Sequence, residues 1–367
     1  MAKFDLFKED YDDGYYHLGK DLEDYPDATI YVVFSGRGPG KTYSGLRYGL
    51  RNNQQIIYMK RTNDDVDIIC NDSKTGLDLS PYVPLNRDFG LDIFGVGIAK
   101  GIGGFWLNRE DVDKPPICYC FALNALKRVK GVEASNADIM IWDECVPTSG
   151  DVQVRRKEGK SEGEQCLDIY MTCNRDREAR GKKEIKLVLL SNTEELTCPV
   201  YETLEIVDDI TDMLAHGESK RYLADRGILI HHILPEEVPK AQMSRKSGIR
   251  RAMKGTKWEE AAFGGSFGTD FSLITREHNF KYNQCIMQIN YKRKPFFIYY
   301  NPVDFSYYAC SKPHTAKRHY DFEKDNNRLK FQVRELVTLK EAIMNGKFQA
   351  EKYTYYDVIM NFQKKFC

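Results

Sequence analysis

The chain has 367 residues, of which 42% are hydrophobic, and its 54 lysines and arginines balance its 54 aspartates and glutamates. This length allows two domains with sizeable cores, and the zero net charge excludes a strongly basic or acidic molecule, so charge must be analysed locally. No run of about 18 apolar residues occurs and the acidic N-terminus has no signal-peptide core, so we expect neither a membrane-spanning helix nor a secretory leader. Ten cysteines without CxxC spacing indicate reduced thiols and no zinc site.

The first motif is a glycine-rich bend that follows an apolar strand, in residues 29–50, TIYVVFSGRGPGKTYSGLRYGL. Strand, glycine loop, Lys-Thr and helix is the arrangement of a phosphate-binding P-loop, although Ser35 stands where the pattern G-x-x-x-x-G-K-[ST] has its first glycine. Such a motif can arise by chance, but its place between a strand and a helix favours a nucleotide site that binds ATP and Mg²⁺. The residues assigned to phosphate and cofactor binding are Gly36, Arg37, Gly38, Gly40, Lys41 and Thr42, with Thr42 as an Mg²⁺ ligand.

Apolar runs that alternate with polar or helical stretches predict the architecture of the first half of the chain. The predicted strands cover residues 29–35, 55–61, 116–123, 137–144 and 186–192. Because these runs are nearly continuous in apolar residues, as buried parallel strands require, they predict an α/β fold with a mainly parallel, doubly wound sheet. The glycine-rich residues 82–107 are interpreted as a hairpin insertion.

The second motif is ADIMIWDEC, residues 137–145, in which an apolar strand ends in two acidic residues. This is typical of a Walker-B strand, with Asp143 holding Mg²⁺ and Glu144 activating the attacking water as general base. The alternative is an ordinary buried strand with acidic residues at its tip. Adjacent Asp and Glu favour hydrolysis by water over phosphoryl transfer to a small substrate.

Two further segments carry candidate residues. The strand KLVLLSN ends at Asn192, where motor ATPases have a polar sensor of the γ-phosphate; the alternative is a strand-end turn. In CNRDREARGKK, residues 173–183, Arg175 and Arg177 could stabilise transition-state charge across a subunit interface, or belong to a solvated basic loop. Four alternatives stay open for further basic residues, which could contact the nucleotide, a neighbouring subunit or DNA phosphates, or form a solvated face: Lys60, Arg61, Lys127, Arg128 and Lys130.

The character of the chain changes after the first half. Residues 1–205 are assigned to the ATPase domain, residues 206–265 to a helical connecting region, and residues 266–367 to a basic α+β domain with 17 lysines and arginines against 10 aspartates and glutamates. Within the last domain, residues 285–302 predict an antiparallel hairpin. Residues 336–366 predict two terminal helices on either side of Asn345-Gly346.

Taken in order, SGRGPGKT, IIYMKR, IMIWDE, NRDRE, LLSN and the late IMNGKF resemble one family over nearly the whole chain. The sequence resembles the DNA-packaging ATPases (encapsidation proteins) of small phi-twenty-nine-like, Picovirinae-type podophages, which are ASCE P-loop motors related to terminase large subunits. It departs from the family pattern at Ser35 and in residues 149–166, and three residues are inserted before NRDRE.

The resemblance implies an ATPase that pumps viral double-stranded DNA into a procapsid as a ring at the portal, typically of five subunits, in the host cytoplasm and without a membrane. It places the arginine finger that a neighbouring subunit supplies on Arg175, with Arg177 as the alternative, and it matches Lys130 to a functional lysine. It implies an RNase H-like second domain that has lost its acidic metal cluster, and in some members this domain contacts a packaging RNA.

Two other functions stay open at this point. A terminase-like enzyme would also cut DNA, which requires several carboxylates that converge on two metal ions. A nucleic-acid-binding scaffold would have a decayed ATP site, which the intact Lys41, Thr42, Asp143 and Glu144 disfavour.

Overall fold

The structure is a computed structural model that divides into two units. The first comprises Met1–Glu205 and Gly217–Gly268, and the second comprises Ile206–His216 and Thr269–Cys367. The residues that the structure describes are 5–8, 10–71, 79–130, 132, 134, 136–147, 159–193, 196–240, 252, 255, 256 and 272–366. Most of the predicted linker beyond residue 240, and residues 149–158 of the segment that departs from the family pattern, lie outside them.

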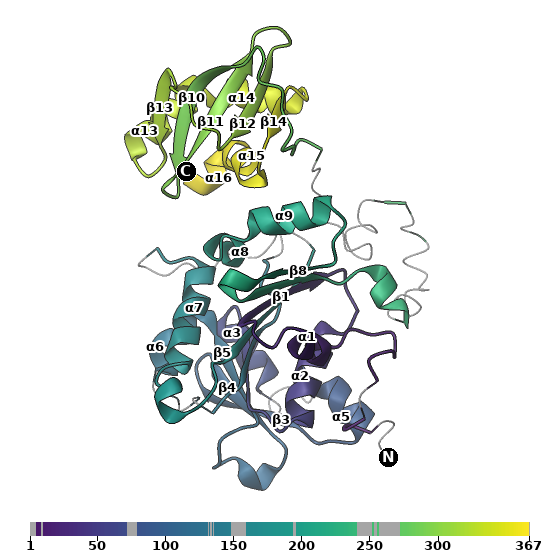
Figure 1. The fold of residues 1–367 in the computed structure, drawn as a ribbon. Helices are drawn as coiled ribbons and strands as arrows, with labels where there is room; N and C mark the ends of the chain where they lie inside the picture. The colour runs from purple at the N-terminus through teal and green to yellow at the C-terminus, as the bar shows by residue number, and fades with distance from the viewer. Residues whose placement is uncertain are drawn as a thin grey trace. The chain divides into compact units, whose positions relative to one another are not determined.

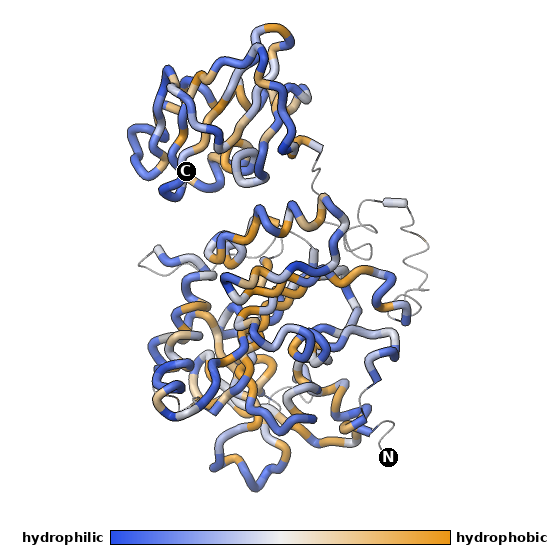
Figure 2. Tube along the Cα trace, in the orientation of Figure 1, coloured by the Kyte–Doolittle hydropathy of each residue, from blue (hydrophilic) through white to orange (hydrophobic). Residues whose placement is uncertain are grey.

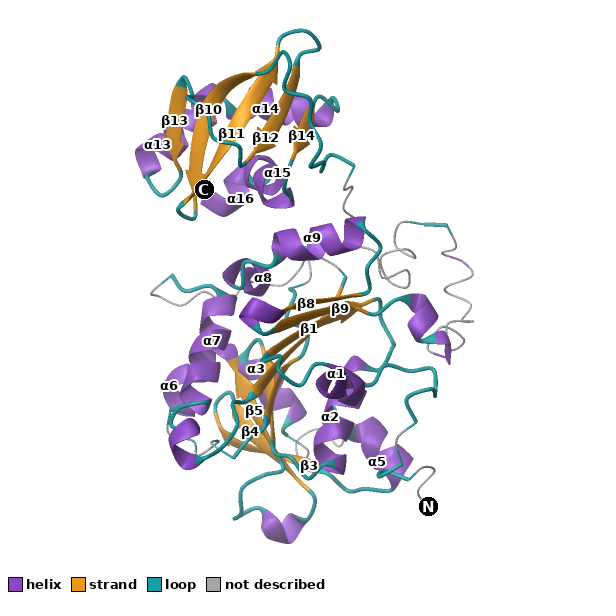
Figure 3. Ribbon diagram, viewed as in Figure 1, coloured by secondary structure: helices purple, strands orange, loops and turns teal. Residues whose placement is uncertain are grey.

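A nine-stranded sheet forms the centre of the first unit (Figures 1 and 3). Its strands, in spatial order, are β3 (Phe94–Ala99), β4 (Ile102–Trp106), β5 (Cys118–Ala122), β2 (Ile56–Lys60), β6 (Ile139–Trp142), β7 (Lys186–Asn192), β1 (Ile30–Ser35), β9 (Ile228–His232) and β8 (Lys220–Leu223). The six strands from β5 to β9 are parallel, whereas β3, β4 and β8 pair antiparallel. The predicted mainly parallel α/β fold is therefore confirmed.

Helices cover both faces of this sheet, with α1, α2 and α5 on one side and α6, α7 and α8 on the other (Figure 3). The helices of this unit are α1 (Leu18–Asp24), α2 (Lys41–Arg51), α3 (Asn63–Ile69), α5 (Val83–Phe89), α6 (Leu126–Val129), α7 (Glu162–Cys173) and α8 (Pro199–Thr203). Short 3-10 helices are η1 (Arg109–Asp111), η2 (Leu123–Ala125), η3 (Glu178–Arg180), η4 (Ala224–Arg226) and η5 (Pro235–Glu237). Because both faces are covered, β2, β5 and β6 are buried almost throughout, which explains their continuous apolar sequence (Figure 2).

The predicted hairpin insertion is real but shorter than residues 82–107. Residues 83–89 form the helix α5, which ends at Gly90 in the left-handed conformation, and only β3 and β4 make the antiparallel hairpin. The predicted helical connecting region is helical only in part, because residues 207–215 form a helix but β8 and β9 within residues 220–232 are strands. The apolar, β-branched run of β9 pairs with β1, with Ile228 opposite Ile30, and so buries its side chains against the core.

The second unit has a five-stranded mixed sheet in the order β13 (Arg318–Asp321), β10 (Gln284–Tyr291), β11 (Lys294–Asn301), β12 (Ser306–Cys310) and β14 (Phe348–Ala350). Its helices are α9 (Val207–Ala215), α13 (Asp325–Arg334), α14 (Leu336–Met344), α15 (Tyr353–Met360) and α16 (Phe362–Phe366). The predicted hairpin is β10 and β11, and α9 joins this unit through a 3.0 Å hydrogen bond from the Thr354 N–H to Asp208 Oδ1. One core combines the strand residues Met287, Ile289, Phe296 and Ile298 with helix residues such as Phe331 and Phe362.

The prediction of two terminal helices over residues 336–366 was incomplete. Gly346, with a φ of 65°, turns the chain after α14, and residues 348–350 then pair parallel with β12 before α15 begins. Phe348 and Ala350 are buried while Gln349 between them is exposed, which is the alternation of a strand with one face on a core. Three residues are too few for this period to stand out between two helical patterns.

A buried ionic cluster ties α1 to the strand β9 in the first unit. His231 Nδ1 lies 2.6 Å from Asp21 Oδ2, and His231 Nε2 lies 3.1 Å from Glu237 Oε2. Lys220 and Tyr16 also donate hydrogen bonds to Asp21, at 2.7 and 3.0 Å. Burial acts to lower the pKa of His231, but the two carboxylates outweigh it and hold that pKa above its ordinary value. Burial acts to raise the pKa of Asp21, and His231 and Lys220 hold it below its ordinary value.

This cluster predicts a pH-dependent stability. Because the pKa of His231 is higher in the folded state, its contribution is complete below about 6.5, its ordinary value, and is lost as the pH rises through the folded pKa. We expect His231→Gln to lower the free energy of unfolding by about 3 kcal/mol at acidic pH, and by less as the pH rises. Urea unfolding followed by tryptophan fluorescence measures this unit, because the described tryptophans, Trp106 and Trp142, are both buried in it.

The exposed Asp225, in the same unit, supplies the control, since Asp225→Asn should change stability little. A His231→Gln deficit that stays constant from acidic to alkaline pH would show that the imidazolium is not the stabilising form.

Candidate active site

The glycine loop lies between β1 and α2 and is shaped by two left-handed residues. Gly38 and Gly40 have φ angles of 91° and 94°, a region that side chains disfavour, and no atom lies within 4 Å of the position that a Cβ would take at either. Both therefore face open space, where a side chain would obstruct an approaching phosphate. Gly40 is also the N-cap of the 11-residue α2 and provides no side-chain cap, so the positive end of α2 faces the same space.

Lys41 lies at the base of this loop with its ammonium group among oxygen atoms. Its Nζ donates to Ser35 Oγ at 2.7 Å, to the Gly36 carbonyl at 3.3 Å and to Asn192 Oδ1 at 3.3 Å. Ser35, the residue that departs from the P-loop pattern, thus gives the lysine a hydroxyl oxygen that glycine could not supply. The departure is compatible with the loop, because the Ser35 side chain is buried and also donates to the Gly36 carbonyl at 2.6 Å.

Asp143 follows β6 and is held by hydrogen bonds from two other segments and from the next residue in the chain. Thr42 Oγ1 and the Tyr58 hydroxyl both donate to its Oδ2, at 3.0 and 2.6 Å, and the Glu144 N–H donates to its Oδ1 at 3.1 Å. Burial, together with the Asp143 carboxylate, raises the pKa of Tyr58 far above its ordinary value, so the hydroxyl keeps its proton and acts as a donor. Hydroxyl and carboxylate oxygens on facing segments are the ligands that Mg²⁺ prefers, so Thr42 and Asp143 fit this ion.

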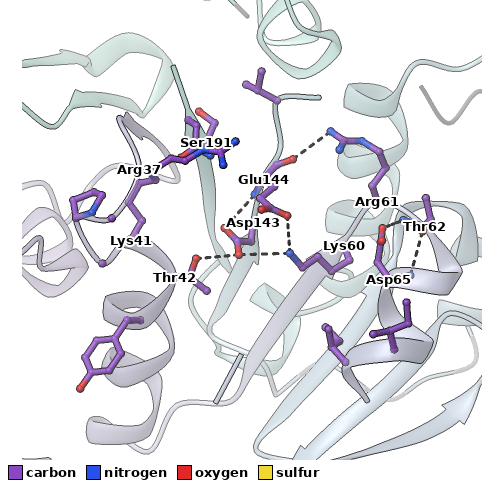
Figure 4. Close-up of a pocket in the computed structure, with 18 residues that line it drawn as sticks. Arg37, Lys41, Thr42, Lys60, Arg61, Thr62, Asp65, Asp143, Glu144 and Ser191 are labelled. Carbon is purple, nitrogen blue, oxygen red and sulfur yellow. Dashed lines mark hydrogen bonds and ion pairs between the residues drawn. The ribbon is translucent and has the colours of Figure 1, made fainter. Parts of the chain in front are cut away.

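Glu144 points into the same pocket with a side chain that is 68% exposed (Figure 4). Its backbone has a φ of 55°, which is uncommon for a residue other than glycine. Lys60 Nζ lies 3.0 Å from Glu144 Oε2 and 3.7 Å from Asp143 Oδ2. Burial acts to lower the pKa of Lys60, but the two carboxylates outweigh it and raise the pKa, so the lysine carries its charge between them.

Most of these groups line one pocket of about 860 Å³, a size that suits a nucleotide. The structure therefore brings together nearly all of the predicted site at the carboxyl ends of β1, β6 and β7. The predicted residues that line the pocket are Arg37, Gly38, Gly40, Lys41, Thr42, Asp143, Glu144 and Asn192. Gly36 does not line it, but its carbonyl accepts a hydrogen bond from Lys41.

The structure separates the two arginines of NRDRE. Arg177 is 2% exposed, and its guanidinium donates to the carbonyls of Lys183 and Ala137 at 2.7 Å and pairs with Asp138. This side chain anchors a loop and cannot extend outward without leaving those contacts. Arg175 is exposed, after the end of α7, and lines a second pocket that shares no residue with the first and also contains Lys127, Lys130 and Lys160.

No protein-family model matches the sequence, and no curated protein does either. Among solved structures, the chain is similar to a chain of the bacteriophage Phi-29 viral genome packaging motor assembly, with a TM-score of 0.59 and 16% identity over 96% of this chain and 100% of that one. The two chains share a fold.

Two other solved structures are similar over parts of the chain. The N-terminal domain of the DNA packaging ATPase from bacteriophage phi29 matches with a TM-score of 0.43 and 16% identity, over 59% of this chain and 95% of that one. The C-terminal domain of the phi29 ATPase matches with a TM-score of 0.21 and 15% identity, over 27% of this chain and 94% of that one.

Sequence reasoning missed Tyr58 and the hydroxyl of Ser35. Tyr58 lies inside the apolar run of β2, where a tyrosine is indistinguishable from a core residue until the neighbouring strand is known. The pairing of Tyr58 with Ile141 in the register of β2 and β6 brings it beside Asp143. One signal in the sequence could have found it. Tyr58 stands two residues before Lys60, a candidate site residue, and residues two apart share a face of a strand.

Two kinds of feature do not occur in the described part of the chain. Among the described residues, no group of three or more His, Cys, Asp or Glu side chains is arranged to hold a metal ion. None of the helices in the described part of the chain is long and apolar enough to cross a membrane.

Tyr58→Phe should leave the fold intact but loosen Asp143, because one of the two donors to Oδ2 is removed. Losing an outer partner of a metal ligand costs about 10- to 100-fold in metal affinity, so we expect at least about tenfold more Mg²⁺ to be needed for tight ATP binding. A fluorescent ATP analogue titrated at several Mg²⁺ concentrations measures this. Tyr31→Phe is the matched control, since the Tyr31 hydroxyl donates to the Tyr25 carbonyl. Equal Mg²⁺ dependence in both variants would remove Tyr58 from the site.

Proposed function

We propose that this protein is an ATPase that drives viral double-stranded DNA into a procapsid. One observation carries the proposal: a P-loop, a paired Asp143 and Glu144, and Asn192 line a single pocket in a chain with the fold of a genome packaging motor. The intact contacts of Lys41 and Asp143 also argue against a scaffold with a decayed site.

Most of the predicted pocket residues would have a role in hydrolysis. The amides of the glycine loop and the Lys41 ammonium would hold the β- and γ-phosphates, and Asn192, 3.3 Å from Lys41, would contact the γ-phosphate. Thr42 and Asp143 would hold Mg²⁺, which supplies neutralisation of phosphate charge when bound. Glu144 is the carboxylate with the most open access to the pocket, and it would accept the proton of the attacking water.

Arg175 is proposed to complete the site of a neighbouring subunit. Helix α7 begins at Glu162, which contacts the pocket residue Arg61, and its 12 residues make it about 18 Å long. Arg175 follows the opposite end of this helix. An arginine side chain is much shorter than this helix, so Arg175 would serve a different subunit's pocket. Lys130 lines the same second pocket and is proposed to contact either the neighbour or DNA.

The assembly that this mechanism needs is a ring of several copies, proposed as a pentamer at the portal of the procapsid in the host cytoplasm. Contacts with DNA would be mainly to its phosphates, because a packaging motor must move any sequence. The chain from residue 266 onward, with its excess of basic residues, is proposed as a nucleic-acid-binding, RNase H-like domain without nuclease activity, and a packaging RNA is one of its candidate partners.

The function is tested by supplying the protein, ATP and DNA to its own procapsids and measuring DNA that becomes resistant to nuclease. Wild-type protein should package. Glu144→Gln should bind ATP but hydrolyse it about 10²- to 10⁴-fold more slowly, because only the base is lost. Lys41→Ala should weaken ATP binding itself. Hydrolysis by Glu144→Gln at the wild-type rate would refute the base assignment, and ATP hydrolysis without packaging would refute the motor.

The arginine finger is tested by mixing two inactive variants. Arg175→Ala should bind ATP but not turn it over, since a finger is worth about 10³- to 10⁵-fold in rate. Glu144→Gln subunits still offer Arg175 to neighbours with an intact Glu144, so a mixed ring contains some complete sites. ATPase rate against mixing ratio should therefore exceed the sum of the two variants. If no ratio does so, Arg175 acts within its own subunit or has no catalytic role.

A further inference from the structure

Arg61 connects the catalytic pocket to helix α7. The residue follows β2 and lines the pocket beside Lys60. Its Nε donates to both carboxylate oxygens of Glu162, at 3.0 and 3.3 Å, and a terminal nitrogen donates to the backbone carbonyls of Glu144 at 3.2 Å and Cys145 at 3.4 Å. One rigid guanidinium therefore holds both the backbone that follows Asp143 and the first residue of α7 (Figure 4 shows the Glu144 contact).

This contact is well shielded from water, which makes it strong and geometrically demanding. The Arg61 side chain is 11% exposed and the Glu162 side chain is 1% exposed. A charged pair this deeply buried is costly to break, because the remaining charge would lack its partner. If one of these two side chains moves, the other therefore follows it more easily than the contact between them breaks.

The far end of α7 is clamped as firmly as its start. Asn174, the C-cap, accepts a hydrogen bond from the Ile185 N–H at 2.9 Å, and Arg177 holds the carbonyl of Ala137 at 2.7 Å. Arg175 lies between these two anchors. Its position is thus set by α7 and by the strands β6 and β7, rather than by a loose loop.

We propose that Arg61 and Glu162 couple the conformation of the Glu144 backbone in a subunit's own site to the position of the Arg175 that the same subunit offers to its neighbour. The inference rests on the proposed ring with a finger in trans. Glu144 has a left-handed φ of 55°, so its peptide has a second, more common conformation available. A change between the two moves the carbonyl that Arg61 holds, and Glu162 passes the movement to α7. Arg61 and Glu162 are in this sense positioning residues.

The test uses donor subunits that can affect the ATPase rate only through their finger. The donor carries Glu144→Gln and cannot hydrolyse ATP, whereas the acceptor carries Arg175→Ala and depends on its neighbour. Adding Glu162→Gln to the donor should lower the rescued ATPase rate at least about tenfold, because a misplacement of about 1 Å can cost about 10²-fold. Donor binding of a fluorescent ATP analogue should stay unchanged.

Glu164→Gln in the same donor is the matched control. Glu164 lies in the same first turn of α7 but is exposed and caps the Ser161 N–H, a role that glutamine can also perform. Equal rescue by the Glu162→Gln and Glu164→Gln donors overturns the coupling. If the parent mixture without either change shows no rescue, the trans finger itself is wrong, and the inference falls with it.

A second variant, which keeps the negative charge at residue 162, tests the proposal if Glu162→Gln destabilises the donor. If Glu162→Gln lowers the melting temperature of the donor, Glu162→Asp replaces it, because the shorter carboxylate leaves Arg61 with a partner but changes the distance. This donor should also rescue less than the Glu164→Gln donor. Full rescue by a folded Glu162→Asp donor overturns the proposal.

Discussion

The carboxylate of Asp143 is the point on which the site depends. Its two oxygens receive hydrogen bonds from Thr42 at the start of α2, from Tyr58 on β2 and from the backbone of Glu144. Two segments that are distant from Asp143 in sequence are thereby fixed around its carboxylate, which we propose as an Mg²⁺ ligand. The Tyr58 contact also shows why a residue in an apolar strand can be functional: burial keeps its hydroxyl protonated and directed at a single acceptor.

The parallel sheet makes this convergence possible. Strands β1, β6 and β7 run in one direction, so the glycine loop, Asp143 and Asn192 all follow strand ends at the same edge. Because β7 lies between β1 and β6, Asn192 reaches Lys41 while Asp143 reaches Thr42. Lys60 and Arg61, at the end of β2, complete the pocket from its other side.

The two arginines of NRDRE both follow α7 but have different surroundings. Arg177 donates to carbonyls of Ala137 and Lys183, which precede β6 and β7, and this fixes the loop that carries the exposed Arg175. The opposite end of α7 begins at Glu162, in contact with Arg61 and the backbone of Glu144. One helix thus lies between the proposed catalytic base of a subunit and the arginine that we propose it offers to a neighbour, and in the proposed ring this would provide a physical basis for ordered hydrolysis.

The sequence by itself determined the elements whose signal is local. The P-loop, the strand ending in Asp143 and Glu144, the strand ending in Asn192 and the parallel α/β class were all predictable, because continuous apolar runs and glycine spacing depend on near neighbours. The tertiary structure alone decided which residues meet. It placed residues 220–232 in the sheet beside β1, brought Tyr58 to Asp143 and Arg61 to Glu162, and buried Arg177 while exposing Arg175. These outcomes depend on strand order and helix packing between distant segments, and two arginines separated by one residue carry no local signal of which will be buried.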